Sequence, residues 1–179
     1  MDLETLQTFT SQLFQVAPGV WGRKELFVNL YIIQDDTTGN WALVDAGLKW
    51  SAPSIKNMAR ELFGEESKPA AIILTHGHFD HVGALSMLLK DWDVPVYAHE
   101  MEMPYLNGKS AYPPADPSVG GGMMSTMSWM YPAGPINISE HLKPFPYDGT
   151  IPELPEWKYI HTPGHSPGHV SLYREKDKV

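Results

Sequence analysis

Three histidines and one aspartate gather in the segment His-Gly-His-Phe-Asp-His at residues 76–81. In an extended segment alternate side chains point the same way, so His76 and His78 can hold one cation together. Asp80 and His81 follow where the chain is expected to turn into a helix, and they can face a second cation. Burying so many ligand-type groups is unfavourable unless a metal satisfies them. The segment is therefore predicted to be a metal site, and solvated loop histidines are the alternative interpretation.

The neighbouring residues indicate which elements position this segment. The apolar run 70–74 predicts a short buried strand before it, and residues 84–90 predict a helix after it. Further strands are expected at 94–97, 158–161 and 170–174. Upstream, the runs 26–34 and 41–45 flank a turn-rich hexapeptide and predict a hairpin. A helix is expected over 51–63, because Ile55, Met58, Ala59 and Leu62 repeat at helical spacing and Gly64 can end it. This order of elements fits an α/β layered sheet.

Four motifs, taken in order along the chain, resemble one family. They are Ala-Leu-Val-Asp-Ala-Gly at 42–47, the segment 76–81, Pro-Val-Tyr-Ala-His-Glu at 95–100 and Thr-Pro-Gly-His-Ser-Pro-Gly-His at 162–169. Together they are similar to the signature of the metallo-β-lactamase-fold hydrolases, and the resemblance runs from about residue 21 to 173. It implies an αββα sandwich formed by a single domain over residues 1–179.

The resemblance also implies a ligand set. His76, His78 and His165 would bind a first metal, and three imidazoles leave a fourth position open, as in catalytic zinc sites. Asp80 and His81 would contribute to a second metal. The expected cofactor is Zn²⁺, one or two per chain, although such ligands also accept iron or manganese. A metal-bound hydroxide would attack a carbonyl carbon, and Asp80 would act in catalysis by orienting it or moving its proton.

Two further residues are expected to support the metal ligands. Asp45 would hold the metal loop through hydrogen bonds, and His169 would pack beside His165. In the family, an Asp that bridges the two metals and a last His follow later in the chain. Neither precedes Val179, so the domain is expected to be an N-terminal portion with its second half incomplete. A homodimer or a companion fragment is expected to complete it.

Residues 101–135 interrupt the pattern with many prolines, glycines and methionines. Long insertions of this kind are usually functional, so this one is predicted to be a lid over the active site. Its adaptable apolar side chains would line a substrate pocket. The alternative is a short helix around residues 123–130 docked on the core. The pocket residues predicted are Tyr105, Tyr112, Met127, Trp129 and Tyr131.

Bulk composition excludes several classes of function. The 179 residues carry 13 basic and 21 acidic side chains, a net charge of −8, which disfavours nucleic acid as a partner. There are no cysteines, which fits a reducing compartment. No segment reads as a membrane span or a signal peptide. A cytoplasmic protein acting on a small molecule is therefore expected.

The motifs favour a zinc-dependent hydrolase of a lactone, ester or thioester, similar to lactonases and glyoxalase II-like thioesterases. A His at position 81 disfavours a true β-lactamase, and the acidic charge disfavours a ribonuclease of the same fold. Two alternatives stay open. One is a single-iron sulfur dioxygenase on the same scaffold. The other is a catalytically impaired fragment that acts as a metal-binding or interaction module.

Overall fold

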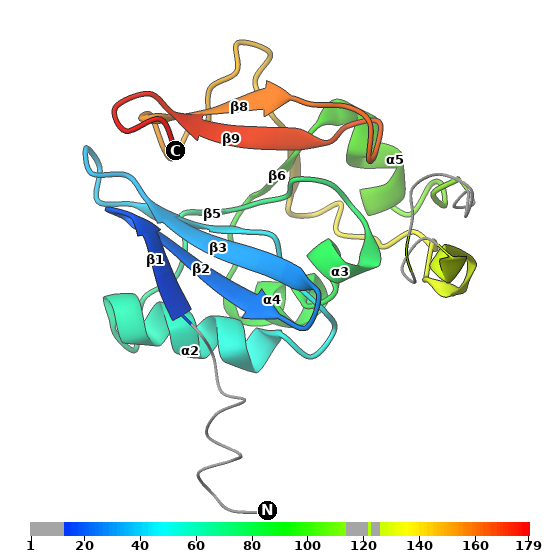
Figure 1. Cartoon of the computed structure of the whole chain (residues 1–179), viewed down its shortest axis with the longest axis horizontal. Coiled ribbons are helices and arrows are strands. Elements are labelled where there is room, and N and C mark those ends of the chain that lie inside the picture. Colours follow the sequence, from blue (N-terminus) through cyan, green and yellow to red (C-terminus); the bar gives the residue numbers. More distant parts are fainter. Residues whose placement is uncertain (1–12, 114–121, 123–125) are drawn as a thin grey trace, which may run out of the picture.

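A computed structural model describes residues 13–113, 122 and 126–179 of the chain (Figure 1). Two sheets and a layer of helices form its architecture. The larger sheet has seven strands in the order β1-β2-β3-β4-β5-β6-β7, and β8 and β9 form a separate pair. The larger sheet consists of β1 (Leu13–Ala17), β2 (Val20–Glu25), β3 (Val28–Gln34), β4 (Trp41–Val44), β5 (Ala71–Ile73), β6 (Val96–Ala98) and β7 (Leu142–Pro144).

The larger sheet changes character at β4. Strands β1 to β4 are paired antiparallel, whereas β4, β5, β6 and β7 run parallel to one another. The carboxyl ends of β4, β5 and β6 therefore meet at one edge, and loops that follow adjacent parallel strands lie close together there. Asp45 follows β4 and the segment 76–81 follows β5, so the topology brings these two motifs side by side.

The hairpin expected from residues 26–45 is confirmed as β3 and β4, whose residues pair antiparallel from Tyr31 opposite Val44 to Gln34 opposite Trp41. Asp35 shapes the turn between them. Its Oδ1 accepts the backbone N–H groups of Thr37 and Thr38 at 3.0 and 2.9 Å. Such an Asx turn satisfies backbone donors that the ladder leaves unpaired. The turn residues thus fix the register of the strands that lead to Asp45.

Both predicted helices form. Helix α2 (Ala52–Phe63) has Pro53 in its first turn and ends at Gly64, which has φ 91°. Helix α4 (Leu85–Asp91) follows the single turn α3 (Phe79–Val82). Their buried residues recur at helical spacing and pack on the sheet. Among the helices of the described residues, none combines the length and the apolar character needed to cross a membrane.

Alternate residues of the central strands face two different cores. Leu43 and Ile72 pack with α2 and α4, whereas Val44 and Ile73 pack on the opposite face of the sheet with Trp157. This alternation follows from the period of two in a strand. It explains why β4 and β5 are apolar without interruption, because both of their faces are buried.

The second layer is the hairpin of β8 (Trp157–His161) and β9 (Val170–Arg174), close to the predicted strands. Figure 1 shows this pair above the larger sheet and α2 and α4 below it. Helices, sheet and second sheet give three layers of the predicted αββα order. The sequence reading missed β1, β2 and β7. The first two lack a clear apolar alternation (Leu-Phe-Gln-Val-Ala and Val-Trp-Gly-Arg-Lys-Glu), and β7 is only three residues long.

The region predicted as a lid contains short helices where it is described. These are η1 (Glu100–Glu102), α5 (Met103–Leu106) and η2 (Ser128–Met130). Residues 114–121 and 123–125 lie outside the described residues, so the lid and the alternative helix around 123–130 stay predictions there. Leu106 of α5 and Ile138 beyond η2 pack in the helix-side core, so both ends of the region are anchored to the domain.

The loop after β4 is pressed against α3. The Gly83 N–H donates to the Gly47 carbonyl at 2.8 Å, and the Ala46 N–H donates to the His81 carbonyl at 2.7 Å. A Cβ on Gly83 would lie 2.5 Å from the carbonyl carbon of Leu48 and from the amide nitrogen of Lys49. Because both neighbours are backbone atoms, only a glycine allows this close approach.

We expect Gly83→Ala to lower the free energy of unfolding by about 1–3 kcal/mol, since the added methyl group must displace backbone. Urea unfolding followed by circular dichroism measures this change. Gly134→Ala is the matched control, because a Cβ there meets nothing within 4 Å, and its effect should stay within about 0.5 kcal/mol. Equal stability of the two variants would contradict the tight contact.

Candidate metal centre

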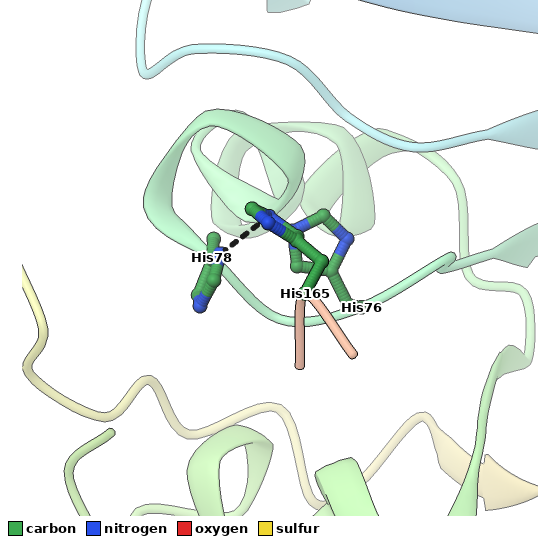
Figure 2. Close-up of side chains that lie close together, drawn as sticks. All are labelled: His76, His78 and His165. Atoms are coloured by element: carbon green, nitrogen blue, oxygen red, sulfur yellow. Dashed lines mark hydrogen bonds between the residues drawn. The ribbon is translucent and has the colours of Figure 1, made fainter. Parts of the chain in front are cut away.

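Three imidazoles from two distant loops meet at one point. His76 and His78 lie in the loop between β5 and α3, and His165 lies in the loop between β8 and β9. One ring nitrogen from each of the three lies within 4.8 Å of those of the other two (Figure 2). These are the residues predicted as ligands of the first metal. The structure brings together what 89 residues of sequence separate.

The spacing of the ring nitrogens fits a metal ion. His165 Nε2 lies 3.1 Å from Nδ1 of His78 and 3.1 Å from Nε2 of His76. Two nitrogens bound to one tetrahedral zinc lie about 3.3 Å apart. A ring nitrogen offers either one proton or one lone pair, so Nε2 of His165 can hydrogen-bond to only one of its two neighbours. A cation accepts all three lone pairs at once.

A chain of hydrogen bonds fixes the tautomer of His76. Asp45 Oδ2 lies 2.8 Å from the Thr75 hydroxyl, which must donate to the carboxylate. The same hydroxyl lies 3.0 Å from His76 Nδ1 and therefore accepts the Nδ1 proton. This leaves a lone pair on Nε2 of His76, the nitrogen that faces His165. Such a partner behind a ligand nitrogen orients the ring and favours metal binding.

The surroundings keep the three imidazoles neutral. Burial lowers the pKa of His76 far below its ordinary value, and neighbouring imidazoles lower it further. Burial also lowers the pKa of His78 and of His165, with the second-largest effect coming from His165 and His169 respectively. Neutral imidazole is the form that binds metals, so the histidines are in the state that a cation requires.

Asp80 and His81, predicted for a second metal, lie beside this group but do not belong to it. His81 Nδ1 lies 2.8 Å from Asp45 Oδ2, and its Nε2 lies 3.6 Å from Asp80 Oδ2. Burial lowers the pKa of His81, but the hydrogen bond to Asp45 and the charges of both carboxylates outweigh it and raise the pKa. Within the described residues these two side chains find no third ligand-type partner to form a second group.

Asp45, predicted to support the metal ligands, lies behind the metal loop. It is buried, and it has a positive φ of 62° at the end of β4. Its Oδ1 accepts the Thr75 N–H at 2.8 Å, and its Oδ2 faces the Thr75 hydroxyl and His81. Asp tolerates this left-handed conformation better than most residues. One carboxylate thus orients His76 through Thr75 and His81 directly.

His169, the other predicted supporting residue, lies next to the three histidines. Its ring centre is 5.3 Å from that of His76 and 6.1 Å from that of His165. Its Nδ1 lies 2.9 Å from the Thr162 hydroxyl. The N–H of Val170 donates to the Thr75 carbonyl at 3.0 Å. These contacts join the second hairpin to the loop that carries His76.

The predicted pocket residues lie in different environments. Tyr131 packs against Phe79 with ring centres 5.3 Å apart, and Phe79 in turn lies 6.5 Å from Phe27 at the β2–β3 turn. An aromatic row therefore borders the metal loop. Met127 and Trp129 are exposed on the insertion.

Tyr105 and Tyr112 lie on the buried side of the metal loop. Their rings stack with centres 3.8 Å apart, and the Tyr112 ring lies 4.6 Å from that of His78. The Tyr112 hydroxyl accepts the Gly77 N–H at 2.8 Å and donates to Glu102. Burial raises the pKa of Tyr112, and so does the bond to Glu102, so this hydroxyl stays a donor. Tyr112 therefore supports the metal loop from its buried side through these hydrogen bonds.

Sequence reasoning missed Thr75, which orients His76, and it missed Glu102. Glu102 is fully buried and contacts both histidine loops through hydrogen bonds. One signal was available, since Glu102 follows β6 much as Asp45 follows β4. Carboxylates after neighbouring parallel strands meet at the same edge of the sheet. Its distance of four residues from the end of β6 hid this relation.

The fold and site together define a class of protein: a layered α/β domain with a cluster of three histidines beside the carboxyl ends of its parallel strands. The family model of the metallo-beta-lactamase superfamily matches residues 23–179, and the chain belongs to this superfamily. A subclass B3 metallo-beta-lactamase of Bradyrhizobium japonicum has the same fold, with a TM-score of 0.64 at 22% sequence identity. That superposition covers 95% of this chain and 60% of the other.

Two curated relatives share more of the sequence. A probable metallo-hydrolase of Bacillus subtilis (strain 168), YflN, is 47% identical over 167 residues, which cover 93% of this chain and 63% of that protein. A hydroxyacylglutathione hydrolase of Bdellovibrio bacteriovorus is 30% identical over 149 residues, covering 83% of this chain and 45% of that protein. The chain therefore spans about half to two thirds of the length of these relatives.

We expect the metal-free protein to lose stability as the pH falls below about 6.5, the ordinary histidine pKa. Below that pH, His76, His78 and His165 bind protons in the unfolded chain but stay neutral in the folded protein, because their folded pKa values are lowered. Proton binding then favours the unfolded state, and the free energy of unfolding decreases as the pH falls. His76→Gln should make the decrease shallower by up to about 1.4 kcal/mol per pH unit. Urea unfolding at several pH values with a chelator present measures it.

His81→Gln is the matched variant with the opposite sign. Because the folded pKa of His81 is raised, its contribution is present below about pH 6.5 and is lost as the pH rises through the folded pKa. The variant should therefore be less stable than the unmutated protein below about pH 6.5, and it should lack the loss of stability that the unmutated protein shows as the pH rises through the folded pKa of His81. Parallel pH profiles for the two variants would contradict the assignment.

Proposed function

We propose that this chain carries the metal centre of a metal-dependent hydrolase that cleaves a carbonyl compound. The observation that supports this most strongly is the convergence of three neutral imidazoles, His76, His78 and His165, at 3.1 Å spacings. A site of three protein nitrogens with an open fourth position is typical of catalytic metal sites. Membership of the superfamily and the metallo-hydrolase name of the Bacillus subtilis relative point the same way.

The three histidines would hold the cation, and we propose Zn²⁺ as that cation because imidazole nitrogen is among its preferred ligands. When bound, such an ion lowers the pKa of water and polarises a substrate carbonyl. The chain's own residues prepare the site. Asp45 and Thr75 hold His76 with its lone pair toward the centre. Burial of His76 excludes water from one side, which strengthens the electrostatic attraction to a cation.

Asp80 is the proposed catalytic carboxylate. Its side chain is 20% exposed and lies 3.6 Å from Nε2 of His81. The other nitrogen of His81 is engaged by Asp45, so His81 presents Nε2 toward Asp80. A half-buried carboxylate in this position can accept a proton from an attacking water and pass it to the leaving group. Asp80 and His81 would also contribute to a second cation if further ligands are supplied.

We propose a thioester as the substrate class, with esters and lactones as related candidates. The hydroxyacylglutathione hydrolase relative supports this choice, because its name describes an acyl thioester of glutathione. The aromatic row of Phe27, Phe79 and Tyr131 beside the metal loop offers an apolar surface for an acyl chain. The net charge of −8 disfavours nucleic acid as a substrate.

A second candidate is a metal-binding module without hydrolytic activity. It is favoured by one observation: the described residues contain one group of three ligand-type side chains, with only Asp80 and His81 beside it. Two ligands make a weak second site. The two candidates differ in the number of metal ions each chain binds and in turnover.

Metal content decides first whether the centre exists. We expect the purified protein to contain at least one zinc per chain, and we expect His76→Ala to lose it, because a buried ligand is removed. Inductively coupled plasma mass spectrometry gives the ratio. His141→Ala is the control, since His141 lies beside Asp93 and away from the triad, and it should keep the metal.

Each outcome selects a function. Two zinc ions per chain mean that the second site is completed, and they support the hydrolase. One zinc that disappears in His76→Ala, together with no turnover of thioester, ester or lactone, leaves the metal-binding module. Iron with oxygen uptake would indicate the sulfur dioxygenase instead, and no metal in the unmutated protein would overturn the metal centre itself.

Asp80→Asn tests the proposed proton transfer. We expect kcat for an acyl thioester to fall by about 10²–10⁴-fold, because the amide cannot accept a proton, while the ion on the histidine triad is retained. Asp93→Asn is the control, since the Asp93 side chain is 95% exposed. An Asp80→Asn enzyme with unchanged kcat would refute the catalytic role of Asp80.

A further inference from the structure

Glu102 is a buried carboxylate with no cation to pair with. Its exposed fraction is 0%, and no salt bridge within the described ranges includes it. A buried ionised group is unfavourable unless hydrogen bonds satisfy it.

Four donors converge on the two carboxylate oxygens. Oε2 accepts the Gly77 N–H at 3.0 Å and the Tyr112 hydroxyl. Oε1 accepts the Ser166 hydroxyl at 2.8 Å and the Gly168 N–H at 2.7 Å. Hydrogen bonds to an ionised acceptor are stronger than neutral ones. The carboxylate is thus satisfied by donors alone.

Three of the four donors belong to the two loops that carry the metal ligands, and the fourth, the Tyr112 hydroxyl, itself accepts the Gly77 N–H. Gly77 lies between His76 and His78, whereas Ser166 and Gly168 follow His165 in its loop. Each oxygen therefore serves one loop. We propose that Glu102 is a positioning residue that clamps the two loops together and so sets the spacing of the three imidazoles. This inference rests on the proposed metal centre.

The clamp leaves no space for other side chains. A Cβ on Gly168 would lie 2.7 Å from Cγ of Glu102, and a Cβ on Gly77 would lie 2.5 Å from the Tyr112 hydroxyl oxygen. Both N–H donors reach the acceptors because they belong to glycines. The contact between the two loops therefore depends on Gly77 and Gly168 as well as on Glu102.

The clamp requires a carboxylate rather than a side chain of the same shape. An amide has one acceptor oxygen and one donor NH₂ group. In Glu102→Gln the NH₂ group would face either the Gly77 N–H and the Tyr112 hydroxyl or the Ser166 hydroxyl and the Gly168 N–H. A hydroxyl can turn to accept from the NH₂ group, but the backbone N–H on that side would lose the carboxylate as its acceptor, and its loop would be held less tightly. The substitution keeps volume, so packing alone would change little.

The experiment measures zinc affinity by competition with a chromophoric chelator, for the unmutated protein, Glu102→Gln and Glu100→Gln. We expect Glu102→Gln to bind zinc about 10–100-fold more weakly, the usual effect of removing a partner behind the ligands. The cobalt(II) absorption spectrum should also lose tetrahedral intensity, which a purely structural role would not predict. Glu100→Gln is the control, because Glu100 is exposed and its carboxylate accepts the Tyr147 hydroxyl, away from the two histidine loops.

A second measurement needs no metal. Amide hydrogen exchange at Gly77 and Gly168 in the metal-free protein should be slow in the unmutated chain and faster in Glu102→Gln, with no change in Glu100→Gln. If Glu102→Gln fails to fold, Ser166→Ala removes one donor from Oε1 and should weaken zinc binding about five-fold.

The two measurements separate the clamp from the metal centre. Slow exchange in an unmutated protein that binds no zinc would refute the metal centre and leave the clamp standing. Unchanged zinc affinity and unchanged exchange in Glu102→Gln would overturn the clamp, and so would equal losses in Glu100→Gln.

Discussion

The site depends on one electrostatic constraint: three imidazole nitrogens must lie about a hydrogen bond apart without sharing protons. His165 Nε2 is 3.1 Å from a nitrogen of His76 and from one of His78, and converging lone pairs repel unless a positive charge lies between them. The rest of the site holds this arrangement in place. Asp45 orients His76 from behind through Thr75, and Glu102 accepts donors from both loops.

The carboxylates of Asp45 and Glu102 support different parts of the site. Asp45, at the end of β4, controls the orientation of rings within one loop, since it bonds to Thr75 and His81. Glu102, beyond β6, acts between loops. Both are buried at the edge where parallel strands end. A sheet that is parallel from β4 to β7 thus supplies polar support on both sides of the β5 loop, which an antiparallel hairpin would not.

Local sequence patterns were enough to predict many of the strands, helices and turns of the fold. The apolar run before His76, the helical spacing from Ile55 to Leu62 and the turn around Asp35 each have short-range causes, and the structure confirms the elements. The grouping of His76, His78 and His165 came from the family resemblance, since no local rule links residues 89 positions apart. Glu102 could not be found because its role depends on contacts with Gly77 and Gly168, which only the packed fold creates. The strands β1 and β2 were missed because their registers depend on pairing more than on composition.

Because His165 lies between β8 and β9, the three histidines come together in a fixed order as the chain is synthesised. The residues that form β5 and the loop with His76 and His78 leave the ribosome well before β8 and β9. The early pair offers two nitrogens, and the third arrives only when the hairpin 157–174 docks on the larger sheet. A cation held by all three would join two separately hydrogen-bonded sheets. Loading with metal would therefore act as a late locking step of folding, and opening of that hairpin would be the natural route by which the ion escapes.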